Sequence, residues 1–149
     1  MVEATLSDVR LEFTLEDGAR LPEYATAGAA GMDLHTVSSV ELERGQRALV
    51  PTGLRVRIPA GFEGQIRPRS GLAVRHGIGM VNAPGTVDSD YRGEIRVLLI
   101  NLGDEPVRLE PGERIAQLVL SPVAHAQTVV VESLDATERG EGGFGSTGR

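Results

Sequence analysis

The sequence contains no cysteine and no lysine, and aromatic residues make up only 3% of its 149 positions. Without cysteine, the chain can form no disulfide and offers no thiolate, so disulfide scaffolds and cysteine nucleophiles are excluded. With so few aromatic residues, aliphatic side chains must build most of the core. No apolar run approaches the roughly 18 residues of a membrane span, and the N-terminal stretch lacks the apolar region of a signal peptide. We therefore expect no membrane association and a cytoplasmic location.

The basic residues are all arginine, and the net charge is −6. A net negative charge argues against binding nucleic acid along a broad basic face. The planar guanidinium fork suits a phosphate group in a local pocket, although a GC-rich genome would give the same preference for arginine. The apolar fraction of 40% and the length indicate a globular chain with a hydrophobic core.

Short segments that alternate apolar and polar residues, separated by Gly and Pro, dominate the chain. In segment 32–37, for example, Asp33 and His35 are expected on the face opposite Met32 and Leu34. We predict about ten such strands, drawn from the segments 9–15, 32–37, 40–42, 48–50, 54–58, 62–67, 78–81, 95–100, 106–109, 115–120 and 128–131. This pattern is typical of an all-β sandwich or barrel.

One short helix is predicted at Ser70–His76, with Ser70 as its N-cap and Gly77 closing its C-terminus. Arg69 precedes the helix and adds a positive charge. The backbone amides of the first turn are free, and the positive end of the helix dipole lies at the same place. This arrangement attracts an anion. The alternative is a plain N-cap at Ser70.

The stretch 81–101 holds two apolar runs around a polar centre, broken by Pro84 and Gly85. We interpret it as a β-hairpin with Asn82, Asp88, Asp90 and Tyr91 near its bend. Its second run, 95–100, is apolar apart from one arginine, which favours a strand buried on both sides. The alternative is an ordinary turn rich in Asp and Ser.

The last eleven residues, 139–149, include five glycines and cannot hold regular structure unaided. They contain a formal G-x-G-x-x-G match, which we reject because no helix can follow it. A Walker loop fails because no lysine follows Gly145. The segment is either a disordered tail or one that wraps a phosphorylated ligand. We therefore predict one domain at 1–134 and a flexible tail at 135–149.

Isolated polar residues within apolar segments allow two interpretations each. Asp33 either faces solvent or orients waters around a divalent cation. Gln117 is either a satisfied core amide or a phosphate contact. The three histidines have no metal-ligand spacing, so a zinc site is not expected; they are His35, His76 and His125.

Taken together and in order, five segments resemble the motifs of the trimeric dUTPases, and the likeness spans the chain from about residue 23 onward. The five are Ala-Gly-Met-Asp-Leu at 30–34, Pro-Arg-Ser-Gly-Leu-Ala at 68–73, Gly-Thr-Val-Asp-Ser-Asp-Tyr-Arg-Gly at 85–93, Arg-Ile-Ala-Gln-Leu at 114–118 and Arg-Gly-Glu-Gly-Gly-Phe-Gly-Ser-Thr-Gly at 139–148.

The resemblance implies a distorted jelly roll and a homotrimer with three active sites at the subunit junctions. Each site would take the first, second and fourth motifs from one chain, the third from another, and the tail from the last. The implied reaction is hydrolysis of dUTP to dUMP and pyrophosphate with Mg²⁺, by attack of water on the α-phosphorus. Such an enzyme limits uracil in DNA and supplies dUMP for dTMP synthesis.

The resemblance also implies residue roles. Asp88 would be the general base, and Asp33 would hold Mg²⁺ through water. Tyr91 would pack against the deoxyribose and exclude a 2′-hydroxyl, while Phe144 would stack on uracil. The other implied substrate-binding residues are Arg69, Ser70, Gly71, Asn82, Gly85, Thr86, Val87, Arg96, Gln117, Arg139, Gly145, Ser146 and Thr147; Arg96 falls where the family varies.

Two other functions remain as alternatives. A dCTP deaminase shares this fold but would need a catalytic Glu in place of the Asp-Ser-Asp-Tyr run at 88–91. A non-catalytic nucleotide-binding or structural jelly-roll trimer would need neither Asp88 nor the tail.

Overall fold

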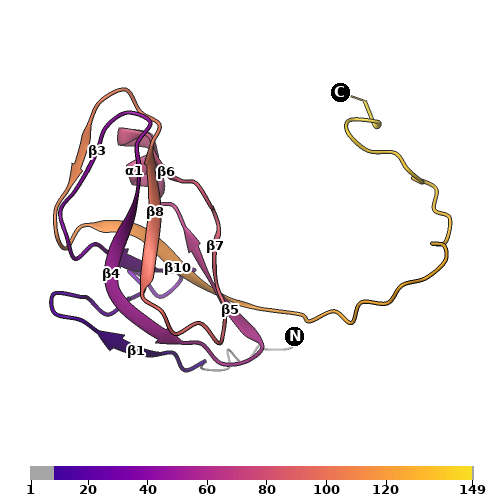
Figure 1. Cartoon of the computed structure of the whole chain (residues 1–149), viewed down its shortest axis with the longest axis horizontal. Coiled ribbons are helices and arrows are strands. Elements are labelled where there is room, and N and C mark those ends of the chain that lie inside the picture. Colours follow the sequence, from indigo (N-terminus) through magenta and orange to yellow (C-terminus); the bar gives the residue numbers. More distant parts are fainter. Residues whose placement is uncertain (1–8, 149) are drawn as a thin grey trace.

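The computed structural model describes residues 9–148 and arranges them as short antiparallel strands with one helix (Figure 1). The elements in chain order are β1 (Glu12–Leu15), β2 (Gly31–His35), β3 (Val40–Leu42), β4 (Arg47–Arg57), β5 (Phe62–Arg67), α1 (Ser70–His76), β6 (Ile78–Met80), β7 (Gly85–Val87), β8 (Ile95–Asn101), β9 (Val107–Leu109) and β10 (Arg114–Pro122). The predicted all-β class is therefore confirmed, in a sandwich-like rather than a closed form. No helix within 9–148 is long and apolar enough to cross a membrane.

Two four-stranded sheets carry the fold. The first has the order β1-β4-β8-β6, and the second has the order β2-β10-β5-β7. A small two-stranded sheet, β3-β9, completes the structure. Because strands that neighbour each other in these sheets come from distant parts of the sequence, the motifs meet only through long-range pairing.

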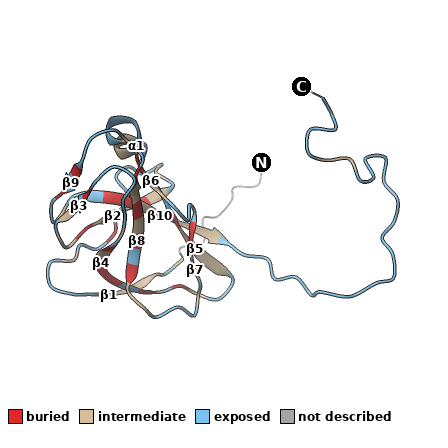
Figure 2. Ribbon diagram, turned by 45° about the horizontal axis from the view of Figure 1, so that its top comes forward, coloured by how far each residue is buried: buried red, intermediate tan, exposed pale blue. Residues whose placement is uncertain are grey.

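The core lies between the two large sheets, and its buried hydrophobic side chains are aliphatic apart from one methionine (Figure 2). Leu34 and Leu118 contribute from one sheet, while Val50, Val97 and Leu99 contribute from the other, all at 0–1% exposure. Alternation sets which residues face inward: in β2, Met32 and Leu34 are buried while Asp33 and His35 are half-buried on the opposite face, as predicted. The aliphatic core follows from the scarcity of aromatic residues.

The predicted strands 48–50 and 54–58 form one continuous strand, β4. A register shift between Pro51 and Leu54 bends it, and Gly53 within the shift adopts a φ of +68° that favours glycine. The Thr52 hydroxyl donates to the carbonyl of Ile95 at 2.6 Å, so the bend stays fastened to β8. The apolar-polar break at this point marks a bulge rather than the end of a strand.

The predicted hairpin at 81–101 is wrong in its pairing. β8 pairs with β6, with Gly79 opposite Ile100, while β7 pairs with β5 in the other sheet. Residues 81–84 therefore cross from the first sheet to the second, and residues 88–94 cross back. β8 also differs from the prediction, because Leu98 and Ile100 are only half-buried and Arg96 is exposed.

Two smaller predictions are also wrong. Segment 128–131 forms no strand, because it lies on an exposed arm beside which the described part of the chain places no strand; Val130 is 99% exposed. The N-cap of α1 is Arg69 in an extended conformation, without a side-chain cap bond, rather than Ser70. The prediction that Gly77 ends helix α1 is confirmed, because Gly77 has a φ of 68° and its amide donates to the carbonyl of Ala73.

Beyond Pro122 the chain leaves the sandwich as a long extended arm (Figures 1 and 2). Within 123–148 there is neither helix nor strand.

Candidate active site

Polar side chains gather where β2, β10 and β5 lie side by side. Gln117 of β10 is in register with Asp33 on one side and Arg67 on the other. The Gln117 side-chain amide donates to the carbonyl of Pro68 at 3.0 Å, which ties β10 to the start of α1. We call this region the polar groove, defined by Asp33, Arg69, Ser70, Gly71, Arg114 and Gln117.

Two adjoining cavities open along the polar groove. One, of about 250 Å³, is lined by Asp33, Gly71 and Arg114, among others. The other, of about 580 Å³, reaches past Arg67 to Pro84. Both cavities share Arg69, Ser70 and Gln117. The two cavities therefore form one continuous surface from Asp33 to Pro84.

The charges in the polar groove favour an anion. The Asp33 carboxylate lies 3.8 Å from Arg69 Nε and 3.5 Å from Arg114 Nη1. One carboxylate thus faces two guanidinium groups. Burial, and next the Arg114 charge, lower the pKa of Arg69. An incoming phosphate would offset the repulsion between the two cations.

His35 lies beside the polar groove. Its Nδ1 atom is buried and has no hydrogen-bond partner among residues 9–148. Burial, and next the Arg20 guanidinium, lower the pKa of His35. At neutral pH the His35 imidazole is therefore neutral, and the arginines supply the positive charge near Asp33.

Arg114 was missed as a site residue, and its position explains why. In a regular strand, Arg114 and Gln117 would face opposite sides, because they are an odd number of residues apart. A register shift between Arg114 and Ala116 breaks the alternation, so Ile115 and Ala116 are both buried and Arg114 reaches Asp33. Only the bulge brings the two residues to one groove.

A second group of predicted residues lies at β7 and in the turn that follows. Within residues 9–148, β7 is an edge strand that pairs only with β5. Asn82 lies against Gly85, since a β-carbon added there would stand 3.3 Å from its amide nitrogen. Gly85 and Val87 are buried, whereas Thr86 and Asp88 are exposed.

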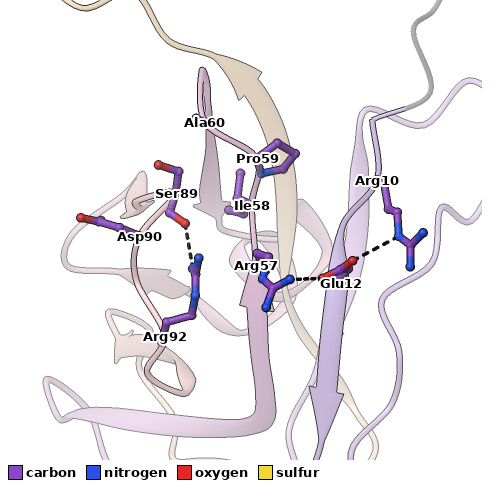
Figure 3. A pocket seen from close by; sticks show the side chains of 9 residues that line it. All are labelled: Arg10, Glu12, Arg57, Ile58, Pro59, Ala60, Ser89, Asp90 and Arg92. Atoms are coloured by element: carbon purple, nitrogen blue, oxygen red, sulfur yellow. Dashed lines mark hydrogen bonds and ion pairs between the residues drawn. The ribbon is translucent and has the colours of Figure 1, made fainter.

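Residues 88–94 form a tight turn that we call the Asp88 loop. The Tyr91 amide donates to the Asp88 carbonyl at 3.1 Å, and the Tyr91 hydroxyl donates to the Glu94 carbonyl at 2.9 Å. Ser89, Asp90 and Arg92 line a separate cavity of about 450 Å³ with residues of β1 and β4 (Figure 3).

The polar groove and the Asp88 loop lie at opposite ends of one sheet. Val87 is opposite Gly64, and Gly64 is opposite Leu120, so Asp88 follows at the Ser121 end of β10. Gln117 lies four residues earlier on that strand, which corresponds to roughly 13 Å at about 3.3 Å per residue. Within one chain, the structure therefore keeps the predicted general base apart from the predicted phosphate ligands.

The remaining predicted residues lie elsewhere. Arg96 is exposed on β8, opposite Pro51, in the other four-stranded sheet. The arm carries the other five residues, Arg139, Phe144, Gly145, Ser146 and Thr147. Their hydrogen bonds are local, such as Arg139 Nε to the Gly142 carbonyl at 2.7 Å. Phe144 is fully exposed.

Comparison with known proteins agrees on one family. A family model described as dUTPase matches residues 17–148. The deoxyuridine 5'-triphosphate nucleotidohydrolase of Anaeromyxobacter sp. (strain Fw109-5) is 64% identical over 129 residues, which cover 87% of this chain and 88% of that protein. The protein of the same name from Fusobacterium nucleatum is 53% identical over 146 residues, covering 97% of this chain and 100% of that protein.

A solved structure supports the same relationship. The dUTPase of Staphylococcus bacteriophage 80alpha, solved with dUPNHPP, superposes with a TM-score of 0.84 at 30% identity. The match covers 94% of this chain and 99% of that chain. The distorted jelly-roll fold is therefore shared.

Proposed function

The chain belongs to the dUTPase family, and on that basis we propose that it hydrolyses dUTP to dUMP and pyrophosphate. One observation carries the proposal: a groove lined by two arginines, a serine and an amide lies in the same fold as an exposed carboxylate on a tight loop. The groove suits a triphosphate, and the carboxylate suits the activation of water.

The polar groove would bind the phosphates. Arg69, Ser70, Gly71 and Gln117 line it with donors, and the paired cations around Asp33 favour an anionic ligand. Because phosphoryl chemistry depends on positioning and charge stabilisation, donors held by β10 and α1 supply much of what the reaction needs.

Mg²⁺ is the expected cofactor, and the residues present fit it. Among residues 9–148, no three His, Cys, Asp or Glu side chains lie together as metal ligands. Mg²⁺ usually takes one or two carboxylates together with substrate phosphates and waters, so Asp33 would suffice by holding the ion through water. When bound, the ion would neutralise charge on the triphosphate.

Asp88 would act as general base on the water that attacks the α-phosphorus. Its carboxylate is exposed at the end of β7, where a neighbouring ligand can approach it. The backbone groups at the edge of β7 would recognise uracil by hydrogen bonding, together with the Asn82 side-chain amide. Tyr91 would cover the deoxyribose and leave no room for a 2′-hydroxyl.

A complete site would require more than one chain, and we propose a homotrimer with shared sites. The separation of Gln117 from Asp88 along β10 supports this assembly. An outward apolar patch also supports it: Leu49 is 55% exposed and lies opposite the half-buried Leu98. The arm of a third chain would bring Phe144 onto uracil and Arg139, Ser146 and Thr147 onto the phosphates, which excludes water.

In the cell, this activity would limit uracil incorporation into DNA and supply dUMP for dTMP synthesis, and we expect a cytoplasmic location. We also propose that 1–134 acts as the folded domain and 135–149 as the mobile tail. Residues 1–8 of that domain lie outside the described residues.

The first test is pyrophosphate release from dUTP, dCTP, dTTP and UTP with Mg²⁺, for the wild type and Asp88→Asn. We expect release from dUTP alone, lost in the variant. If dUTP hydrolysis survives the substitution, Asp88 is not the base. If dUTP binds without release from any nucleotide, the chain is a binding module.

Shared sites are tested by co-refolding Asp88→Asn, which should be inactive, with Gln117→Ala, which should bind dUTP weakly, and by assaying the mixture at a low dUTP concentration. If each site takes Asp88 and Gln117 from different chains, about a quarter of the sites in randomly mixed trimers recover both residues. If each site is built within one chain, mixing restores no activity.

A further inference from the structure

The Asp88 loop is closed on itself by one arginine. Arg92 Nη1 donates to the carbonyl of Ser89 at 2.7 Å and to the carbonyl of Tyr91 at 3.0 Å. Figure 3 shows the Arg92 side chain turned back toward Ser89 rather than extended into solvent. The guanidinium thus fixes the backbone on both sides of Asp90, although the side chain itself is exposed.

A second arginine fastens the same loop to the sandwich. Arg55 of β4 donates from Nη1 to the carbonyl of Arg92 at 2.9 Å. Near it, the Gly53 amide donates to the Glu94 carboxylate at 3.2 Å, which ties the end of the loop to the bend in β4. The loop is therefore held from one rigid strand rather than by its own turn alone.

The three carbonyl oxygens contacted by the arginines belong to Ser89, Tyr91 and Arg92, all within four positions after Asp88. Charge-assisted hydrogen bonds are stronger and more directional than neutral ones. The Asp88 carboxylate takes no part in these bonds, so it stays available for a ligand while its backbone is fixed.

We propose that Arg55 and Arg92 are positioning residues, which set the orientation of Asp88 and Tyr91 without touching the substrate. The proposal rests on the function proposed above, in which Asp88 activates water and Tyr91 contacts the sugar. A catalytic group on a loop gains from such support because small displacements from the productive geometry cost rate.

The chain offers a matched control for Arg55. Arg57 lies two residues further along β4, on the same face, and is exposed like Arg55. Arg57 pairs with Glu12 of β1 at 2.8 Å instead of with the loop (Figure 3). Replacing either arginine removes one charge and one hydrogen bond from the same strand, but among residues 9–148 the bond of Arg55 goes to the Asp88 loop and that of Arg57 goes to Glu12.

The experiment compares Arg55→Ala, Arg55→Lys and Arg57→Ala in the full chain. Hydrogen exchange followed by mass spectrometry, without nucleotide, reports the order of residues 88–94. We expect faster exchange there in Arg55→Ala alone, with Arg55→Lys close to wild type because an ammonium can still donate to the Arg92 carbonyl. All three variants should keep the wild-type melting temperature within a few degrees, since the side chains are exposed.

Steady-state kinetics on dUTP provide the second readout. Arg55→Ala should lower kcat by about tenfold with little change in KM, because the phosphate contacts lie in the polar groove and stay intact. Arg92→Ala, which removes two loop bonds, should lower kcat further and weaken the preference for dUTP over UTP. Arg57→Ala should match the wild type.

Equal exchange at 88–94 and equal kcat in Arg55→Ala and Arg57→Ala would overturn the positioning role while leaving the proposed reaction in place. A wild type without dUTP hydrolysis would instead overturn the proposed function. The exchange measurement uses no nucleotide, so it separates the two failures.

Discussion

Gly93 lies directly against the side chain of Tyr91. A β-carbon added at Gly93 would overlap the Tyr91 hydroxyl oxygen and stand 2.5 Å from Cζ. The same hydroxyl donates to the carbonyl of Glu94. The ring therefore packs against the backbone of Gly93 and is oriented by this hydrogen bond. The absence of a side chain at Gly93 therefore sets where the ring lies.

Gly93→Ala should displace the Tyr91 ring and weaken rejection of the 2′-hydroxyl. The ratio of kcat/KM for dUTP over UTP should fall by about tenfold or more, since a fixed pocket discriminates only while its geometry holds. Gly79→Ala is the control, because its nearest neighbour would be a Leu102 methyl at 4.0 Å. An unchanged ratio in Gly93→Ala would show that Tyr91 does not select the sugar.

Gly31→Ala should disturb phosphate binding through Gln117. A β-carbon at Gly31 would stand 2.6 Å from the Gln117 Oε1 atom and 3.1 Å from its Cβ, so the amide must leave the Pro68 carbonyl. We expect a severalfold higher KM for dUTP with a smaller change in kcat, as for a loss of uniform binding. Gly28→Ala, which meets nothing within 4 Å, should match the wild type.

Phe144→Ala should reduce activity without affecting stability. The side chain is fully exposed in the chain, so the melting temperature should not change. Loss of a ring that stacks on a base costs about 1–3 kcal/mol, which corresponds to a fall of about fivefold to 150-fold in kcat/KM for dUTP. Val130→Ala, equally exposed on the same arm, serves as the control; a similar loss there would point to the arm as a whole.

The link between β9 and the segment before β3 should show pH dependence. Glu110 pairs with Arg108 and accepts from the Ser39 hydroxyl at 3.0 Å. The Arg108 hydrogen bond, and next the Ser39 hydrogen bond, hold the pKa of Glu110 below its ordinary value of 4.5. Between the lowered pKa of the folded state and about pH 4.5 the unfolded chain therefore binds more protons, so the stability contributed by this group is present at neutral pH and is lost as the pH falls through that window.

Glu110→Gln should thus lower the melting temperature slightly at pH 7 and by less at pH 3. The measurement is a thermal scan at both values, with Glu132→Gln on the exposed arm as the control. A difference from wild type that is equal at both values would mean that the ionised form of Glu110 contributes nothing.

The sequence determined the strands and the motifs, because both depend on neighbours along the chain. Alternation placed Asp33 and His35 opposite Met32 and Leu34, and Gly77 marked the end of α1 as predicted. The five motifs identified the family from contiguous residues, and the family comparison confirms it. Segment 128–131 failed because β-branched residues favour a strand only where a neighbour exists to pair with them.

Tertiary structure decided everything that depends on pairing between distant segments. Pairing of β7 with β5 rather than β8 carries Asp88 to the other sheet, and the bulge after Arg114 turns that residue toward Asp33. The hydrogen bond from Arg55 to the Arg92 carbonyl in the Asp88 loop joins residues that are 37 positions apart in the sequence. Alternation along the sequence predicts on which face of its own strand a side chain lies. Register, bulges and strand order depend on the packing of the whole chain.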